Sequence, residues 1–154
     1  MELYEDLLVQ ASHQLQIAEH MLNETYPFVK DPKMLPAIVE RLYCALDYAL
    51  TALLRCEHNH NRIPSYKDDF DEKCKIFKKT AKRYKLKSQY GLEEIRDLVV
   101  KHRQTQLAFA RKENFVMVKN HKIDTLSLIR VKGFLSKTKI FIDDIRNQLR
   151  TQNV

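Results

Sequence analysis

Residues 37–54 constrain the fold more than any other part of the chain. Apolar side chains recur there three and four positions apart, which is the spacing of one face of an α-helix. These apolar residues are Ile38, Leu42, Ala45, Leu46, Ala49, Leu50, Leu53 and Leu54. Together they cover a wider part of the helix surface than one neighbouring helix can bury. We therefore expect a central helix that packs against several others.

The remainder of the chain predicts an all-α fold. Two glycines and four prolines in 154 residues are few for a sheet protein with many turns, and they suit long helices. Helical periodicity also covers residues 3–23, 66–84 and 92–103, and a last stretch that runs to the C-terminus. We predict an up-and-down bundle of about five helices, in a single domain over residues 1–154 with one buried core.

Prolines and capping residues mark the expected helix ends. The segment 26–32, with Pro27 and Pro32, should break the first helix, and the second should begin near Pro36. Ser65 is the expected N-cap of the third helix, with Asp68 completing a pattern like a capping box. Either Ser127 or Thr125 is expected to cap the last helix.

A short β-hairpin is expected just before the last helix, at about residues 112–127. Residues 114–118 and 123–126 have strand character, and the polar residues 119–122 between them suit a turn. A lone hairpin is only marginally stable, so it should pack on the bundle or pair with another chain.

The net charge of +7 is unevenly distributed along the chain. No lysine or arginine precedes Lys30, whereas residues 73–87 contain eight basic residues and no acidic one. A basic surface favours an anionic partner, and Lys78, Lys79, Lys82 and Arg83 are candidates to hold an RNA backbone. The alternative is an ordinary solvated helix face. The chain has no glycine-rich phosphate loop.

Arg96, Asp97 and His102 lie on one expected helix, and their chemistry suits a phosphate. Arginine is a permanent cation whose planar fork matches phosphate oxygens, and histidine exchanges a proton near neutral pH. With a histidine as base, a ribose 2′-hydroxyl can attack the adjacent phosphorus while the arginine stabilises the charge, without a metal. Asp97 would orient Arg96, and Arg103 would extend the cationic row.

The spacing of Arg96 and His102 limits this interpretation. Six positions along a helix correspond to about 9 Å of rise and about 120° of rotation, so on a straight helix the two side chains do not meet. Either the helix bends or frays near His102, or a second copy completes the site across a symmetric dimer interface along this helix. The alternative is a solvated arginine and a core histidine.

These elements resemble the HEPN superfamily (higher eukaryotes and prokaryotes nucleotide-binding domain) of small helical domains. That family has an Arg/Lys-x-x-Tyr-x-Ala-like run on one helix and an Arg, a polar residue and a His on a later one. The matching residues are Arg41, Tyr43, Ala45 and Asp47 for the first element and Arg96, Asp97 and His102 for the second. The resemblance covers roughly residues 1–146. The chain departs from the commonest pattern by about 25 residues inserted between Gln104 and Arg130.

The resemblance implies a dimeric, metal-independent endoribonuclease whose catalytic residues Arg96 and His102 meet at the dimer interface. It also implies a possible role as the toxin of a toxin–antitoxin pair, with an antitoxin or a small nucleotidyltransferase as partner and no cofactor. Some HEPN members are not catalytic, so a module that binds RNA, a nucleotide or a protein is the alternative. A third possibility is a metal site at Cys56, His58 and His60, although a second ligand pair is missing.

Cysteine content and hydropathy bear on the cellular compartment. Cys44, Cys56 and Cys74 are odd in number and widely spaced, which does not indicate a disulfide framework. No segment approaches the roughly 20 apolar residues that span a bilayer, and the first ten residues are acidic rather than basic. We expect a cytoplasmic protein without a membrane anchor.

Overall fold

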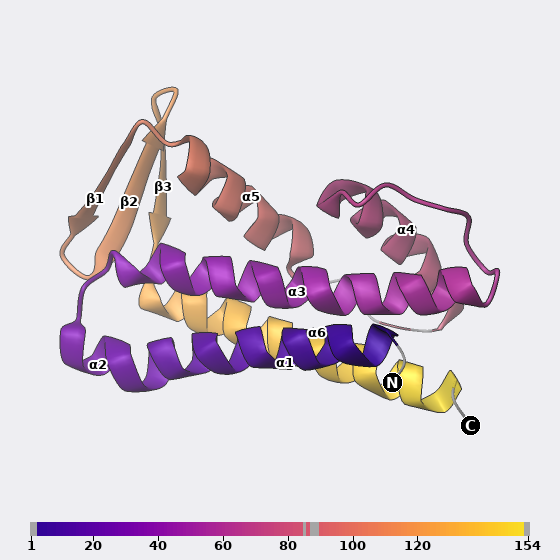
Figure 1. Cartoon of the computed structure of the whole chain (residues 1–154). Coiled ribbons are helices and arrows are strands. Elements are labelled where there is room, and N and C mark those ends of the chain that lie inside the picture. The colour runs from indigo at the N-terminus through magenta and orange to yellow at the C-terminus, as the bar shows by residue number, and fades with distance from the viewer. Residues whose placement is uncertain (1–2, 85, 87–89, 153–154) are drawn as a thin grey trace.

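The computed structural model describes residues 3–84, 86 and 90–152. Helices account for most of this part of the chain, and a three-stranded antiparallel sheet lies just before the last helix (Figure 1). The helices are α1 (Leu3–His20), α2 (Tyr26–Val29), α3 (Met34–Asn59), α4 (Phe70–Arg83), α5 (Leu92–Gln104) and α6 (Leu128–Gln152). The strands are β1 (Leu107–Arg111), β2 (Asn114–Lys119) and β3 (Lys122–Leu126). The predicted helical class and the strand insertion are confirmed.

Helix α3 is the centre of the bundle, as its apolar pattern predicts. It contacts α1 and α6 along its length and also packs against α4 and α5. All eight apolar residues listed above for residues 37–54 are fully buried. At about 1.5–3 kcal/mol for each large side chain removed from water, this helix supplies a large part of the hydrophobic stabilisation of the fold. Figure 1 shows α4 and α5 on the same side of α3, towards its opposite ends.

The first helical segment does not break at Pro27. A π-helical turn (Met21–Thr25) follows α1, and α2 continues directly, with Pro27 in its first turn. A missing backbone N–H is tolerated in a first turn, which explains why the proline does not end the segment. The segment ends at Lys30, whose left-handed backbone (φ 51°) lets its N–H donate to the carbonyl of Tyr26 at 2.7 Å.

The expected N-cap is wrong for α4 and confirmed for α6. The N-cap of α4 is Asp69 rather than Ser65, and its carboxylate accepts the N–H of Glu72 at 3.2 Å. Asp68, expected in a capping box, instead forms an ion pair with the buried Lys73. At α6 the expected cap is present, because Ser127 Oγ accepts the N–H of Arg130 at 3.2 Å.

The sheet contains one strand more than the expected hairpin, because β1 adds to the outside of β2. Its register pairs Phe109 with Val116, and Val116 with Thr125. Since side chains alternate between faces, Phe115, Met117 and Leu126 share the inner face and are buried against the bundle. The outer face carries Leu107, Phe109, Val116, Val118 and Ile123.

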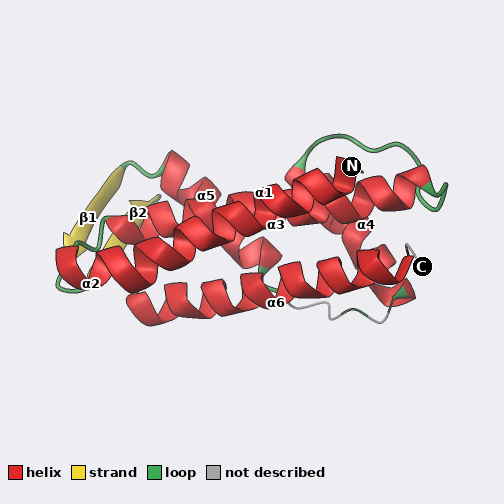
Figure 2. Cartoon of the chain, turned by 60° about the horizontal axis from the view of Figure 1, so that its bottom comes forward, coloured by secondary structure: helices red, strands yellow, loops and turns green. Residues whose placement is uncertain are grey.

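The sheet stands at one end of the bundle, beside α2 (Figure 2). Among the described helices, none is both long and apolar enough to cross a membrane.

Candidate functional site

Helix α5 carries the predicted catalytic residues. It begins after Gly91, which has a left-handed backbone (φ 76°), and it is regular α-helix from Leu92 to Gln104. The helix is therefore neither bent nor frayed at His102. Within one chain, Arg96 and His102 stay about 9 Å apart along the axis and project in different directions. The structure does not bring them together.

Arg96 lies between two carboxylates on the side of α5 that faces α4. Its Nε is 3.1 Å from Asp71 Oδ1, and its Nη2 is 3.2 Å from Asp97 Oδ1. Its side chain is 32% exposed. Asp97 thus has the contact that an orienting role requires, while Asp71 is a partner that the sequence reasoning missed. A phosphate would have to compete with both acids for the guanidinium.

His102 faces a different direction, towards the sheet. Its ring meets the edge of Phe115, with 5.8 Å between ring centroids, and the side chain is half-buried. It lines an open pocket of about 660 Å³ between the start of α3 and the sheet, which we call the His102 groove. The groove is lined by Lys33, Pro36, Ala37, Glu40, Arg41, Cys44, His102, Ala108 and Phe115.

Two cations share the groove with His102. Lys33 and Arg41 are both exposed, and Arg41 Nη1 donates to Gln14 Oε1 at 3.2 Å. Within the described part of the chain, neither cation forms an ion pair. From the sequence, Arg41 was identified only through the family resemblance, and Lys33 was not identified at all. The helical spacing of Lys33, Ala37, Arg41 and Cys44 opposite the apolar face is the signal that would have placed them together.

Arg103 is held by Glu40 at the edge of the groove. Its Nε and Nη2 lie 3.1 and 2.9 Å from the two carboxylate oxygens of Glu40. The guanidinium also lies over the ring of Tyr43, 5.6 Å from its centroid. Burial and, next, Asp47 raise the pKa of Tyr43, so its phenol stays protonated at neutral pH and is not a general base.

The basic residues of α4 lie away from the groove, over the other end of α3 (Figure 1). Lys78, Lys79 and Lys82 are exposed, and Lys78 forms an ion pair with Glu93. Arg83 is half exposed but pairs with Glu57. These four side chains remain candidates for RNA contacts, on a surface separate from His102.

One lysine of the same basic run is not on the surface at all. The side chain of Lys73 is only 3% exposed. Its Nζ donates to Thr51 Oγ1 at 2.9 Å and to Asp47 Oδ1 at 3.1 Å, and it also pairs with Asp68. The charge of Lys73 is therefore balanced within the α3–α4 contact and cannot attract RNA.

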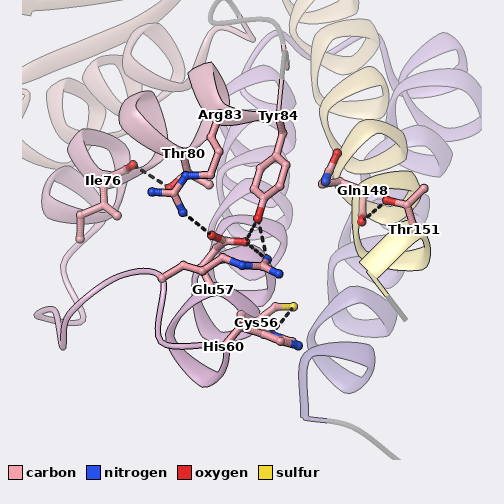
Figure 3. A network of polar contacts seen from close by, with 10 residues as sticks. Cys56, Glu57, His60, Ile76, Thr80, Arg83, Tyr84, Gln148 and Thr151 are labelled. Atoms are coloured by element: carbon pink, nitrogen blue, oxygen red, sulfur yellow. Dashed lines mark hydrogen bonds and ion pairs between the residues drawn. The ribbon is translucent and has the colours of Figure 1, made fainter. Parts of the chain in front are cut away.

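A buried carboxylate joins the ends of α3 and α4 (Figure 3). The fully buried Glu57 accepts the hydroxyl of Tyr84 at 2.5 Å and pairs with Arg62 at 3.1 Å and Arg83 at 3.4 Å. Burial and the hydrogen bond and charge of Glu57 raise the pKa of Tyr84. The sequence reasoning missed this network, which satisfies a buried charge and is structural.

The metal site considered at Cys56, His58 and His60 is not supported. Cys56 Sγ lies 3.7 Å from His60 Nδ1 (Figure 3), but the same nitrogen is 2.7 Å from the carbonyl of Cys56. His58 turns to the carbonyl of Ile63 and to the ring of Tyr66. Over residues 3–84, 86 and 90–152, no three His, Cys, Asp or Glu side chains are grouped to hold a metal ion.

Comparison with known proteins adds no relative. No protein-family model, no curated protein and no solved structure matches the chain. The function must therefore be argued from the geometry of the His102 groove and of α5.

Proposed function

We propose that this protein is a metal-independent endoribonuclease of the HEPN type, with His102 as its acid or base. The observation that carries the proposal is the His102 groove itself, where a titratable side chain shares an open pocket with two cations, Lys33 and Arg41. Glu40 is the acid of this groove, and Arg103 neutralises it. The groove is therefore positive and suits a phosphate backbone.

The chemistry needs a base, an acid and cations around one phosphate. A His102 imidazole accepts the proton of the ribose 2′-hydroxyl, and the 2′-oxygen bonds to the adjacent phosphorus. The bond from phosphorus to the 5′-oxygen breaks, and that oxygen takes a proton from a water molecule. The products are a 2′,3′-cyclic phosphate and a 5′-hydroxyl. DNA lacks the attacking hydroxyl and is not cleaved.

A second copy supplies the arginine to each site in this proposal. Because α5 is straight, Arg96 and His102 of one chain are too far apart to act on one phosphate. Two copies related by a two-fold axis perpendicular to α5 would place their α5 helices antiparallel and bring Arg96 of each towards His102 of the other. Light scattering tests this step, since a strict monomer at the concentration of the cleavage assay contradicts it.

The direct experiment is cleavage of a labelled structured RNA in EDTA. We expect cleavage by the wild type to leave cyclic phosphate ends, and Arg96→Ala and His102→Ala to lose it. His121→Ala is the matched control, because His121 is an exposed residue of the β2–β3 turn. Equal cleavage by all variants, or cleavage of the matching DNA, contradicts the proposal.

A non-catalytic binding module is the second candidate, and one observation favours it. Both Arg96 and Arg103 are held by carboxylates, so neither is free to meet a developing phosphate charge without a rearrangement. RNA binding without cleavage in the same assay would favour this candidate. A role as a toxin, with an antitoxin or nucleotidyltransferase as partner, belongs to the first candidate and depends on the cleavage result.

A further inference from the structure

Strand β1 has an unprotected edge. In the sheet order β1-β2-β3 it pairs with β2 on one side only, and all five of its residues are exposed. Its sequence is Leu-Ala-Phe-Ala-Arg, so four of the five side chains are apolar. Proteins usually protect an edge strand with charges, proline, a bulge or a covering element, because free backbone N–H and C=O groups recruit another strand. The only charged side chain of β1 is Arg111, at the C-terminal end of the strand.

The two faces beside this edge differ in character. On the outer face, Leu107 is 56% exposed and Phe109 is 39% exposed. Ile123, 70% exposed, lies in the same cross-strand row as Leu107. On the inner face the residues are Ala108 and Ala110, whose small side chains leave room, and Ala108 lines the His102 groove. A strand added at the edge would thus have apolar neighbours outside and the groove inside.

The charges around the edge are mainly positive, although the β1–β2 turn also carries the exposed Glu113. Lys33 and Arg41 line the groove that Ala108 borders, and Arg111 and Lys112 stand at the end of β1. None of these four side chains forms an ion pair with a described residue. Pairing β1 with β1 of a second copy would bring two such basic regions together, which costs electrostatic free energy. An acidic segment at the same edge would instead be attracted by these basic residues, so its binding is electrostatically favourable.

We propose that the edge of β1 binds an extended, acidic segment of another polypeptide as a fourth strand. Backbone hydrogen bonds to β1 supply the affinity, and side-chain alternation supplies the specificity. Apolar residues of the segment would lie beside Leu107 and Phe109, and the acidic residues between them would face Lys33 and Arg41. The bound segment would lie over the His102 groove and exclude RNA. That exclusion rests on the proposed function, whereas the binding of the segment does not.

The experiment uses the full chain and a fluorescein-labelled peptide of about nine residues in which valine and glutamate alternate. We expect saturable, salt-sensitive binding by anisotropy, with slowed hydrogen exchange at the β1 amides that face away from β2. Arg41→Glu should weaken binding about tenfold. Lys75→Glu, the same change on exposed α4, should leave binding unaltered. N-methylation of alternate peptide amides along one edge should abolish binding, and along the other should not.

Several results would overturn the inference. Absence of peptide binding does so, as does binding that leaves the β1 amides exchanging freely. Slow exchange at those amides in a dimer of the protein alone would show that a second copy covers the edge. The same protection by an oligouridylate would show a nucleic-acid surface instead. Peptide binding by a protein that does not cleave RNA contradicts only the proposed function, and cleavage without peptide binding contradicts only this inference.

Discussion

Arg103 and Glu40 form a bidentate ion pair, with Arg103 Nε 3.1 Å from Glu40 Oε1 and Arg103 Nη2 2.9 Å from Glu40 Oε2. The pair joins the C-terminal end of α5 to the first half of α3, beside the His102 groove. It also removes one free acid and one free cation from the groove's edge. The positive character of the groove is therefore left to Lys33 and Arg41.

Glu40→Gln is expected to tighten RNA binding several-fold, because it frees Arg103 to contact a phosphate. The slope of log affinity against log salt concentration should become steeper by about one. A salt titration with a labelled single-stranded RNA measures both effects. Glu24→Gln, at an exposed position of the π-helical turn, is the control for net charge. Unchanged or weaker binding by Glu40→Gln contradicts the assignment of the groove.

Cys44 should report on occupancy of the groove. It is half-buried and lines the groove, and burial together with the nearby Glu40 raises its pKa, so alkylation near pH 8 is slow but measurable. Saturating RNA should slow it further. Mass spectrometry of maleimide-treated protein measures the rate at each cysteine, and the buried Cys56 and Cys74 serve as unreactive references. If RNA leaves Cys44 labelling unchanged, RNA binds elsewhere.

Tyr84→Phe is expected to lower the free energy of unfolding by about 1–2 kcal/mol. The substitution removes the hydroxyl that donates to buried Glu57 at 2.5 Å and leaves that carboxylate to the two arginines. Urea unfolding measures the change. Tyr48→Phe, at a half-buried position of α3, controls for loss of a tyrosine hydroxyl as such. Equal stability of the two variants would mean that the Tyr84 hydrogen bond adds nothing.

Cys74 should make the protein less stable in alkali. Burial, with smaller contributions from Glu93 and Asp71, raises its pKa from 9.0 to about 12. Above pH 9 the unfolded chain therefore loses this proton first, and the stability that the protonated thiol contributes is complete below pH 9 and lost between pH 9 and about 12. Urea unfolding in reductant, from about pH 8.5 to about pH 10.5, measures the free energy of unfolding at each pH. This free energy should fall less steeply with pH for Cys74→Ala than for the wild type. The Cys74 thiol can add at most about 1.4 kcal/mol per pH unit to the wild-type slope. Identical slopes contradict the prediction.

The parts of the fold that depend on local periodicity could be predicted from the sequence. The apolar pattern of residues 37–54 predicts the central helix, because the side chains that a helix buries on one face recur three and four residues apart in the sequence. Strand β1 could not be found in this way, since its five exposed residues lack the alternation of a half-buried strand. Ser65 failed as a cap because Asp69, closer to Phe70, has an equally suitable side chain.

The candidate site was only partly predictable, because its residues come from elements distant in sequence. Spacing on one helix shows that Arg96 and His102 diverge, and the straight α5 agrees. It does not show that His102 meets Phe115, or that Lys33 and Arg41 share its groove. Nor does it show which cations already have acids beside them, such as Arg96 with Asp71 and Arg103 with Glu40. Those pairings are tertiary and leave no local pattern.

Complementation between two inactive variants tests the central claim most directly. Arg96→Ala and His102→Ala are mixed in equal amounts under conditions that exchange subunits, with native mass spectrometry to confirm mixed dimers. Each mixed dimer keeps one complete site, so RNA cleavage in EDTA should return to about one quarter of the wild-type rate. Mixed dimers that form but do not cleave RNA, beside an active wild type, would contradict a site shared between two copies.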